Sequence, residues 1–176
     1  SSGATDVNGL SDGLVESNSL YIGNDPSATT STAQYNVAVG ETALDAITTA
    51  DNNVAVGYNA LTANTTGKNN TATGWGALSL SVTAQYNTAY GYAALKNTTG
   101  TQNTATGPFA MYYNTTGSYN TANGMETMYG NTIGNYNAAY GRHALGANQN
   151  GNYNTAIGDS AGKFIANGST GNKYGD

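Results

Sequence analysis

The chain has 176 residues, a formal net charge of −5 at pH 7 and a charged fraction of only 9%, with 24 glycines and no cysteine. This acidic balance argues against nucleic acid as a partner and against membrane insertion, because nucleic acids and anionic membranes are bound by clustered Lys and Arg. The lack of cysteine excludes disulfides and thiolate metal sites. No apolar run reaches the length of a membrane span or a signal-peptide core.

The N-terminal region differs from the rest of the chain. Residues 1–18 carry three glycines and few apolar side chains, so we expect a connector or N-terminal cap there and a single β-solenoid repeat domain over residues 19–176. Seven of the ten acidic residues precede Leu61, and every Lys and Arg follows it. Because no loop of the D-x-D-x-D-G kind is present, we interpret these acids as a solvated end rather than a calcium site.

From residue 19 onward, a five-residue kernel, Asn-x-Ala-x-Gly, recurs almost end to end. Eight full copies follow at steps of 17 residues, with a single 16-residue step into Asn103, and imperfect copies at residues 19–23 and 171–175 keep the register. Such a short, fixed period is typical of a solenoid. The kernels begin at Asn36, Asn53, Asn70, Asn87, Asn103, Asn120, Asn137 and Asn154. They end at Gly40, Gly57, Gly74, Gly91, Gly107, Gly124, Gly141 and Gly158.

The composition of this unit favours strands over helices. It is dense in Thr, Asn and Gly and lacks apolar residues at i, i+3, i+4 and i+7. We therefore predict an all-β parallel β-roll or β-solenoid of about nine to ten coils. Each coil is expected to hold two short strands, one at the kernel and one at an Ala-Leu pair further on. The kernel glycines suit a corner with positive φ, and a second set suits a second corner, at Gly67, Gly100, Gly117, Gly134 and Gly151.

Comparison among the copies separates inward from outward positions. The third kernel residue is always Ala, and an Ala and a Leu or Met follow the glycine by three and four residues, as at Ala60 and Leu61. We expect these columns to be buried, and the constant Asn to form a hydrogen-bonded ladder. The two positions directly after the glycine vary freely in chemistry, so we expect them to face outward and to carry any recognition surface.

Aromatic residues recur at two positions of the repeat. A tyrosine precedes the kernel asparagine in several coils, and a self-stacked file of rings is favoured there over a sugar-binding one. Those residues are Tyr35, Tyr86, Tyr119, Tyr136 and Tyr153. The outward positions after the glycine form the candidate glycan contact, with Tyr58, Trp75, Tyr92 and Phe109.

The residues needed for catalysis are sparse, and we expect no enzyme, no cofactor and no metal. The one histidine, His143, stands at a variable outward position, where a surface residue needs no role. Asp45 and Asp51 are better explained as solvated acids than as a carboxylate pair for glycan hydrolysis. The Asn-x-Ser/Thr patterns are interpreted as turn residues rather than as glycosylation sites.

The kernel and its spacing resemble a known family. The Asn-x-Ala-x-Gly unit is similar to the YadA-like head repeat of trimeric autotransporter adhesins, and residues 53–74 (NVAVGYNALTANTTGKNNTATG) look closest to repeats in tail-fibre proteins of marine and cyanobacterial phages. The resemblance implies a left-handed β-roll in a homotrimer, with the Ala and Leu columns of three rolls meeting on the axis. It also implies a virion tail fibre that extends toward, or attaches to, the host surface, with host glycans as partners.

Two alternatives stay open at this point. One is the head of a bacterial trimeric adhesin at the cell surface, for which the chain would also be a segment of a longer repeat protein. The other is a monomeric surface or ice-binding solenoid, because Thr71/Thr73 and Thr104/Thr106 fit the T-x-T pattern of ice-binding faces. The other coils break that pattern, which a lattice-matched face would not tolerate.

Overall fold

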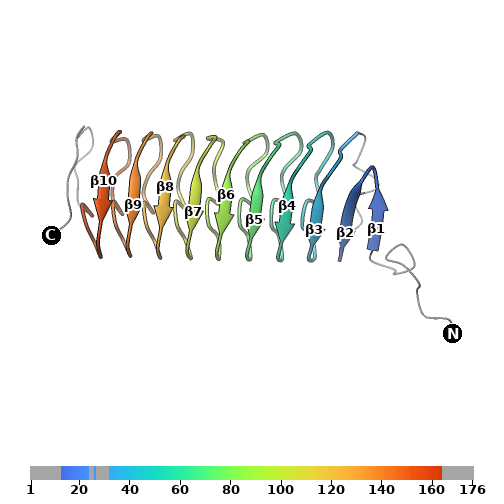
Figure 1. Ribbon diagram of the computed structural model, residues 1–176, viewed down its shortest axis with the longest axis horizontal. Coiled ribbons are helices and arrows are strands. Elements are labelled where there is room, and N and C mark those ends of the chain that lie inside the picture. Colours follow the sequence, from blue (N-terminus) through green and yellow to red (C-terminus); the bar gives the residue numbers. More distant parts are fainter. Residues whose placement is uncertain (1–12, 24–25, 27–31, 164–176) are drawn as a thin grey trace.

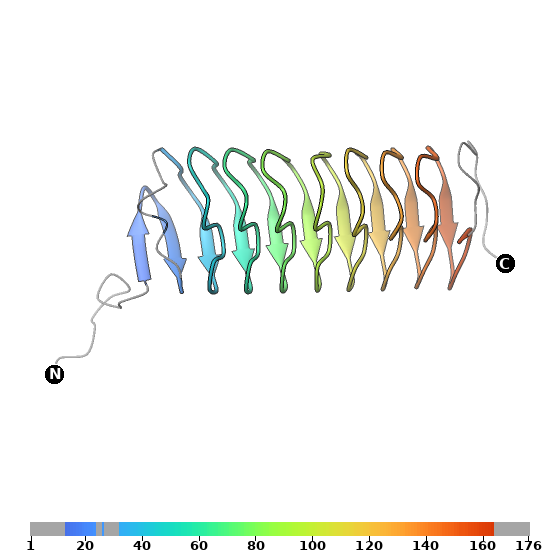
Figure 2. The same cartoon turned by 180° about the vertical axis from the view of Figure 1, so that it is seen from behind.

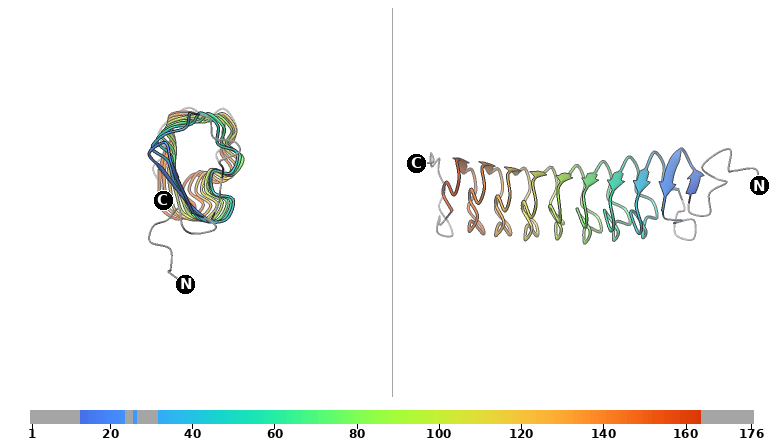
Figure 3. Two further views of the ribbon diagram at one scale, coloured as in Figure 1. Left: turned by 90° about the vertical axis from the view of Figure 1, so that its right-hand side faces the viewer. Right: turned by 90° about the horizontal axis from the view of Figure 1, so that it is seen from below.

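A computed structural model describes residues 13–23, 26 and 32–163 of the chain. This part winds into a parallel β-solenoid of about eight turns, seen from the side in Figures 1 and 2 and end-on in Figure 3. The all-β parallel solenoid predicted from the repeat is confirmed. The imperfect copy at residues 171–175 lies outside the described residues, so the predicted count of nine to ten coils extends beyond them.

The strands are short and form a single sheet in chain order. Parallel neighbours pair one coil apart, so that Ala38 lies beside Ala55 and Ala55 beside Ala72. The strands are β1 (Gly13–Glu16), β2 (Ser19–Ile22), β3 (Val37–Val39), β4 (Val54–Val56), β5 (Thr71–Thr73), β6 (Thr88–Tyr90), β7 (Thr104–Thr106), β8 (Thr121–Asn123), β9 (Ala138–Tyr140) and β10 (Thr155–Ile157).

The first strand, β1, is the outermost strand at the N-terminal end of the sheet. β1 pairs antiparallel with β2 through a two-residue turn, Ser17-Asn18, in which both residues have positive φ as a tight hairpin requires. The backbone of β2 is thereby covered on the side where an open edge would be available to other chains. The predicted connector or cap at residues 1–18 lies outside the described residues as far as residue 12.

Each described coil holds one strand, so the prediction of a second strand at the Ala-Leu pair is wrong. Leu44 and Leu61 have φ values of 53° and 51°, and the other Leu and Met residues of this column are also left-handed. The backbone turns here: Ala43 N donates to Gly40 O of its own coil at 3.2 Å, and Leu44 N donates to Ala60 O of the next coil at 3.0 Å. The bond from Leu44 to the next coil offsets the cost of the left-handed conformation of leucine.

The core is a narrow space inside one chain. The kernel alanines of the eight full copies and the Leu and Met residues after them are 0% exposed in the single chain. The implied trimer axis made of these columns is therefore wrong, since they are already shielded from water. The apolar area that one coil cannot hide is covered by the coils above and below it.

The two sets of glycines are required for different reasons. The kernel glycines have φ values such as 127° at Gly57 and Gly107, which confirms the predicted corner. Gly67, Gly100, Gly117 and Gly134 do not have positive φ, so backbone conformation is not what requires glycine at these positions. A Cβ on Gly100 would lie 2.8 Å from the Gly117 carbonyl carbon, so close backbone packing between coils is what requires glycine here.

Candidate binding surface

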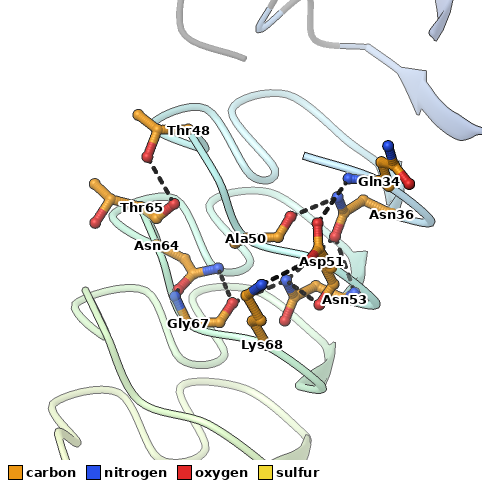
Figure 4. Close-up of polar contacts among 10 residues, drawn as sticks. All are labelled: Gln34, Asn36, Thr48, Ala50, Asp51, Asn53, Asn64, Thr65, Gly67 and Lys68. Carbon is orange, nitrogen blue, oxygen red and sulfur yellow. Dashed lines mark hydrogen bonds and ion pairs between the residues drawn. The ribbon is translucent and has the colours of Figure 1, made fainter. Parts of the chain in front are cut away.

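The kernel asparagines form the scaffold on which the outer surface is built. All eight are buried, and each binds the coil before it, as Asn53 illustrates in Figure 4. Its backbone N–H and its Nδ2 donate to Asn36 Oδ1 at 2.9 and 3.2 Å, and Nδ2 also donates to Gly67 O at 2.9 Å. The ladder begins at Ser19, whose Oγ accepts from Asn36 N at 2.9 Å. The predicted asparagine ladder is confirmed.

A second buried column, polar at six of its seven described positions, lies seven residues after the kernel glycines and was not predicted. Asn64 shows its local role: Oδ1 accepts from Gly67 N and Nδ2 donates to Gly67 O, both at 3.0 Å (Figure 4). Thr98 takes this place in the 16-residue coil, where its Oγ1 accepts from Gly100 N at 2.9 Å. The column comprises Ile47, Asn64, Ser81, Thr98, Asn114, Asn131 and Asn148.

The two positions after the kernel glycine behave differently from each other. The first is exposed in all eight coils, including Tyr58 and Trp75, as predicted. The second is only half-buried or fully buried and has positive φ in every coil, from Thr42 (58°) to Ser160 (56°). The prediction that both positions face outward is wrong for the second, because its left-handed backbone turns the side chain partly back along the coil surface.

The residues proposed for glycan contact lie together and continue into a longer aromatic strip. Tyr58 and Trp75 stack with ring centroids 6.1 Å apart, and Trp75 and Tyr92 stack at 4.8 Å. Tyr92 meets Phe109 edge to face at 5.0 Å. We define the aromatic strip as Tyr58, Trp75, Tyr92, Phe109, Tyr112, Tyr113 and Tyr129, which are linked ring to ring.

Sequence reasoning missed the second half of this strip. Tyr112 and Tyr129 stand five residues after their kernel glycines, at a position that holds Thr62 or Ser79 elsewhere. The structure brings Phe109 within 5.7 Å of Tyr112, and Tyr112 within 5.5 Å of Tyr129, centroid to centroid. The signal was present in the run Phe-Ala-Met-Tyr-Tyr, whose three aromatic residues stand two, five and six residues after Gly107.

The tyrosines before the kernel asparagine form a file only in part. Tyr119, Tyr136 and Tyr153 stack at 4.8 and 5.0 Å with interplanar angles of 7° and 1°. Tyr35 and Tyr86 have no stacking neighbour in this column, because the adjacent coils hold Asn52, Asn69 and Gln102 there. The predicted self-stacked file is confirmed for the last three members.

Charged side chains pair between adjacent coils. Lys68 Nζ lies 2.6 Å from Asp51 Oδ2, and the hydrogen bond from Lys68 is the main cause that holds the pKa of Asp51 below 3.8. Arg142 Nε lies 2.8 Å from Asp159 Oδ1, and this hydrogen bond lowers the pKa of that carboxyl. His143 is half-buried, with Nδ1 3.1 Å from Glu126 Oε2, rather than an isolated surface residue.

Other kinds of site are not seen within the described ranges. Residues 13–23, 26 and 32–163 contain no group of three or more His, Asp or Glu side chains placed to hold a metal ion. The same residues form no surface pocket. None of their segments is a helix long and apolar enough to span a bilayer. What the described surface offers is exposed aromatic rings on a repetitive rod.

Comparison of the chain with models of protein families, with curated proteins and with solved structures yields no match.

Proposed function

We propose that this chain is a non-enzymatic structural and adhesive fibre segment, part of a phage tail fibre that extends toward or attaches to the host surface. One observation carries the proposal: the asparagine, Ala and Leu columns continue from coil to coil and are buried, whereas side-chain chemistry varies at exposed positions. Such a rod keeps its shape through contacts between neighbouring coils. Its surface can change without disturbing the stack, which suits a fibre that must reach and adhere.

We also propose that the rod assembles as a left-handed homotrimer. Since the Ala and Leu columns are buried within one chain, the copies must meet through another face. The outward face of β3 to β10 suits this role because none of its side chains is charged, and interface cores are depleted in charge. At its N-terminal end, Val37, Val39, Val54 and Val56 are each 36% exposed.

The trimer proposal is tested by the mass of the native particle in light scattering. A mass of three chains is expected for the unmodified chain. Val56→Lys places a charge on the outward sheet face and is expected to give single chains, whereas Asn69→Lys adds the same charge at an exposed turn and is expected to keep the trimer. A mass of one chain for the unmodified protein would rule out this assembly.

The adhesive part of the proposal assigns glycan contact to the aromatic strip. Tyr58, Trp75 and Tyr92 are 43%, 41% and 45% exposed, although stacking covers part of their ring faces. Aromatic rings with a polar rim pack against the C–H face of a sugar while donating hydrogen bonds. The strip follows the axis of the rod over several coils, which fits an extended glycan rather than a single small molecule.

Replacement of Tyr58, Trp75 and Tyr92 by Ala tests this contact. Binding of the fluorescently labelled rod to host cells is expected to be lost, while the far-ultraviolet circular dichroism spectrum stays unchanged. The matched control is the double variant Tyr35→Ala and Tyr86→Ala, which removes two rings that are 57% and 58% exposed elsewhere on the rod. Equal binding by the triple variant and the control would refute the role of the strip.

A further inference from the structure

A lysine lies within the aromatic strip. Lys96 Nζ is 5.9 Å from the ring centroid of Trp75 and 5.5 Å from that of Tyr112. It therefore joins the two halves of the strip, with Tyr92 and Phe109 between them in the chain of ring contacts. A lysine ammonium group has three N–H donors, and contact with ring faces does not give it an anionic partner.

The partners of Lys96 differ from those of Lys68 and Arg142. Lys68 binds Asp51, and Arg142 binds Asp159, in each case across one coil. Lys96 makes no ion pair with any described residue, since its neighbours along the column are Ser79 and Tyr112. Its positive charge is thus available to an anion in a chain whose net charge is −5.

The ring geometry also changes at this point. On the N-terminal side, Tyr58, Trp75 and Tyr92 are nearly parallel, with interplanar angles of 19° and 7°. On the C-terminal side, Phe109 is tilted by 65° against Tyr92, and Tyr113 by 85° against Tyr112. Tyr112 also stacks on Tyr129, with an interplanar angle of 17°. Rings packed edge to face leave part of their faces uncovered. Trp75 and Tyr92 are 41% and 45% exposed, so partly exposed rings lie beside an ammonium group that has no ion pair among the described residues.

We propose that Lys96, together with Trp75, Tyr92 and Tyr112, forms a subsite for a hexuronic acid residue of an extended polysaccharide. The carboxylate accepts a hydrogen bond from Lys96 Nζ, and the C–H groups of the pyranose lie against the exposed parts of these rings. The single cation fits one carboxylate, whereas polyphosphates and nucleic acids require clustered basic residues. This inference rests on the proposed glycan contact and names the chemical class of the sugar.

The probe pair for this subsite is trigalacturonate and its fully methyl-esterified form, which share one sugar backbone and differ in charge. In titration calorimetry, we expect the unmodified rod to bind the acid about tenfold more tightly than the ester, as for a charge-assisted hydrogen bond. Lys96→Gln is expected to reduce the affinity for the acid to that for the ester, and Lys96→Arg to retain most of the preference. Lys68→Gln, which changes the net charge equally outside the strip, is expected to leave it intact.

The outcomes separate the two proposals. If both probes bind equally to the unmodified rod, or if Lys96→Gln keeps the preference, the hexuronic acid subsite is refuted while glycan contact stands. If neither probe binds, the subsite is refuted, and loss of host-cell binding in the Tyr58, Trp75 and Tyr92 triple variant then decides the glycan contact independently. A preference that disappears equally in Lys68→Gln and Lys96→Gln reflects overall charge and also refutes the subsite.

Discussion

The kernel segment and the turn segment of each coil contribute differently to the rod. The kernel, from asparagine to glycine, keeps Asn, Ala and Gly in all eight full copies, whereas the buried column of the turn holds Asn, Thr, Ser or Ile. The kernel asparagine binds the backbone of two coils at once, as Asn120 does with Oδ1 to Asn137 N at 2.9 Å and Nδ2 to Gly134 O at 2.8 Å. The turn asparagine binds the backbone of its own loop, and its contacts with the next coil are to side chains of the same column. Side chains that bind the backbone of the next coil therefore tolerate less change than side chains that bind their own loop and one another.

The largest expected difference is between two glycines, one from each segment. Gly107→Ala in the kernel combines a φ of 127° with a Cβ that would lie 2.5 Å from Gly124 O. We expect it to lower the free energy of unfolding by about 4 kcal/mol, because backbone strain and overpacking add. Gly76→Ala in the turn has a φ of 64° with Ser79 Oγ at 3.7 Å, and Ala93 already occupies the equivalent place with a φ of 52°.

We expect Gly76→Ala to cost about 1 kcal/mol, the ordinary cost of a left-handed alanine. Urea unfolding followed by circular dichroism measures both values. Equal losses for the two variants would mean that backbone conformation, and not contact between coils, requires glycine at the kernel.

The two asparagine columns provide the next comparison. Asn120→Ala leaves the buried N–H of Asn137 without its acceptor, and we expect a loss of about 3 kcal/mol in unfolding free energy. Asn131→Ala removes the bonds from Nδ2 to Gly134 O and to Asn114 Oδ1. The backbone of Gly134 keeps both of its other partners, since its N–H donates to Gln149 O and its carbonyl accepts from Asn120 Nδ2. About 2 kcal/mol is expected there, because no backbone group is left unpaired. A greater loss for the Asn131 variant in the same urea titration would mean that the turn column stabilises the rod more than the kernel column does.

The 16-residue coil before Asn103 lacks one residue of the turn, and restoring that residue tests how well the turn tolerates its loss. Residues 97–100 already read Asn-Thr-Thr-Gly, but Asn97 stands six residues after Gly91, whereas Asn114 stands seven after Gly107. Insertion of one asparagine between Asn97 and Thr98 restores the 17-residue spacing and places an asparagine at the seventh position. The new side-chain amide reproduces the Asn114 Nδ2 bond to Gly117 O, 2.8 Å long, so we expect a gain of about 1 kcal/mol. A thermal melt of the repaired chain against the original measures it. A lower melting temperature would show that neighbouring coils have adapted to the shorter turn.

The smallest effect is expected from the ion pair beside the turn. Asp51→Asn removes the attraction to Lys68, whose partly exposed side chain limits the loss to less than about 1 kcal/mol. Because the folded pKa of Asp51 is lower than 3.8, its contribution is present above that pH and disappears as pH falls through the folded value. The difference in unfolding free energy between the unmodified chain and Asp51→Asn should therefore decrease as the pH falls. A difference independent of pH would exclude the ion pair as its cause.

Several features were determined by the sequence alone. The constant 17-residue step predicted the solenoid, and a polar residue that never changes at an interior corner predicted the ladder of Asn36 through Asn154. The corner glycines such as Gly57 followed from the same repetition. These predictions succeeded because a repeat that stacks on itself places equivalent residues one above another, so that comparison among copies reports directly on three-dimensional neighbours.

The tertiary structure decided what depends on the path of the chain within one coil. Leu61 has a φ of 51° in place of a strand conformation, and the buried Leu and Met columns fill a single chain instead of a shared axis. The contacts of Tyr112 with Phe109 and of Lys96 with Trp75 join different offsets of the repeat. The sequence period fixes which residues are equivalent but not how the backbone turns between them. Hydrogen bonds between coils select that turn, and these form only when the coils are stacked.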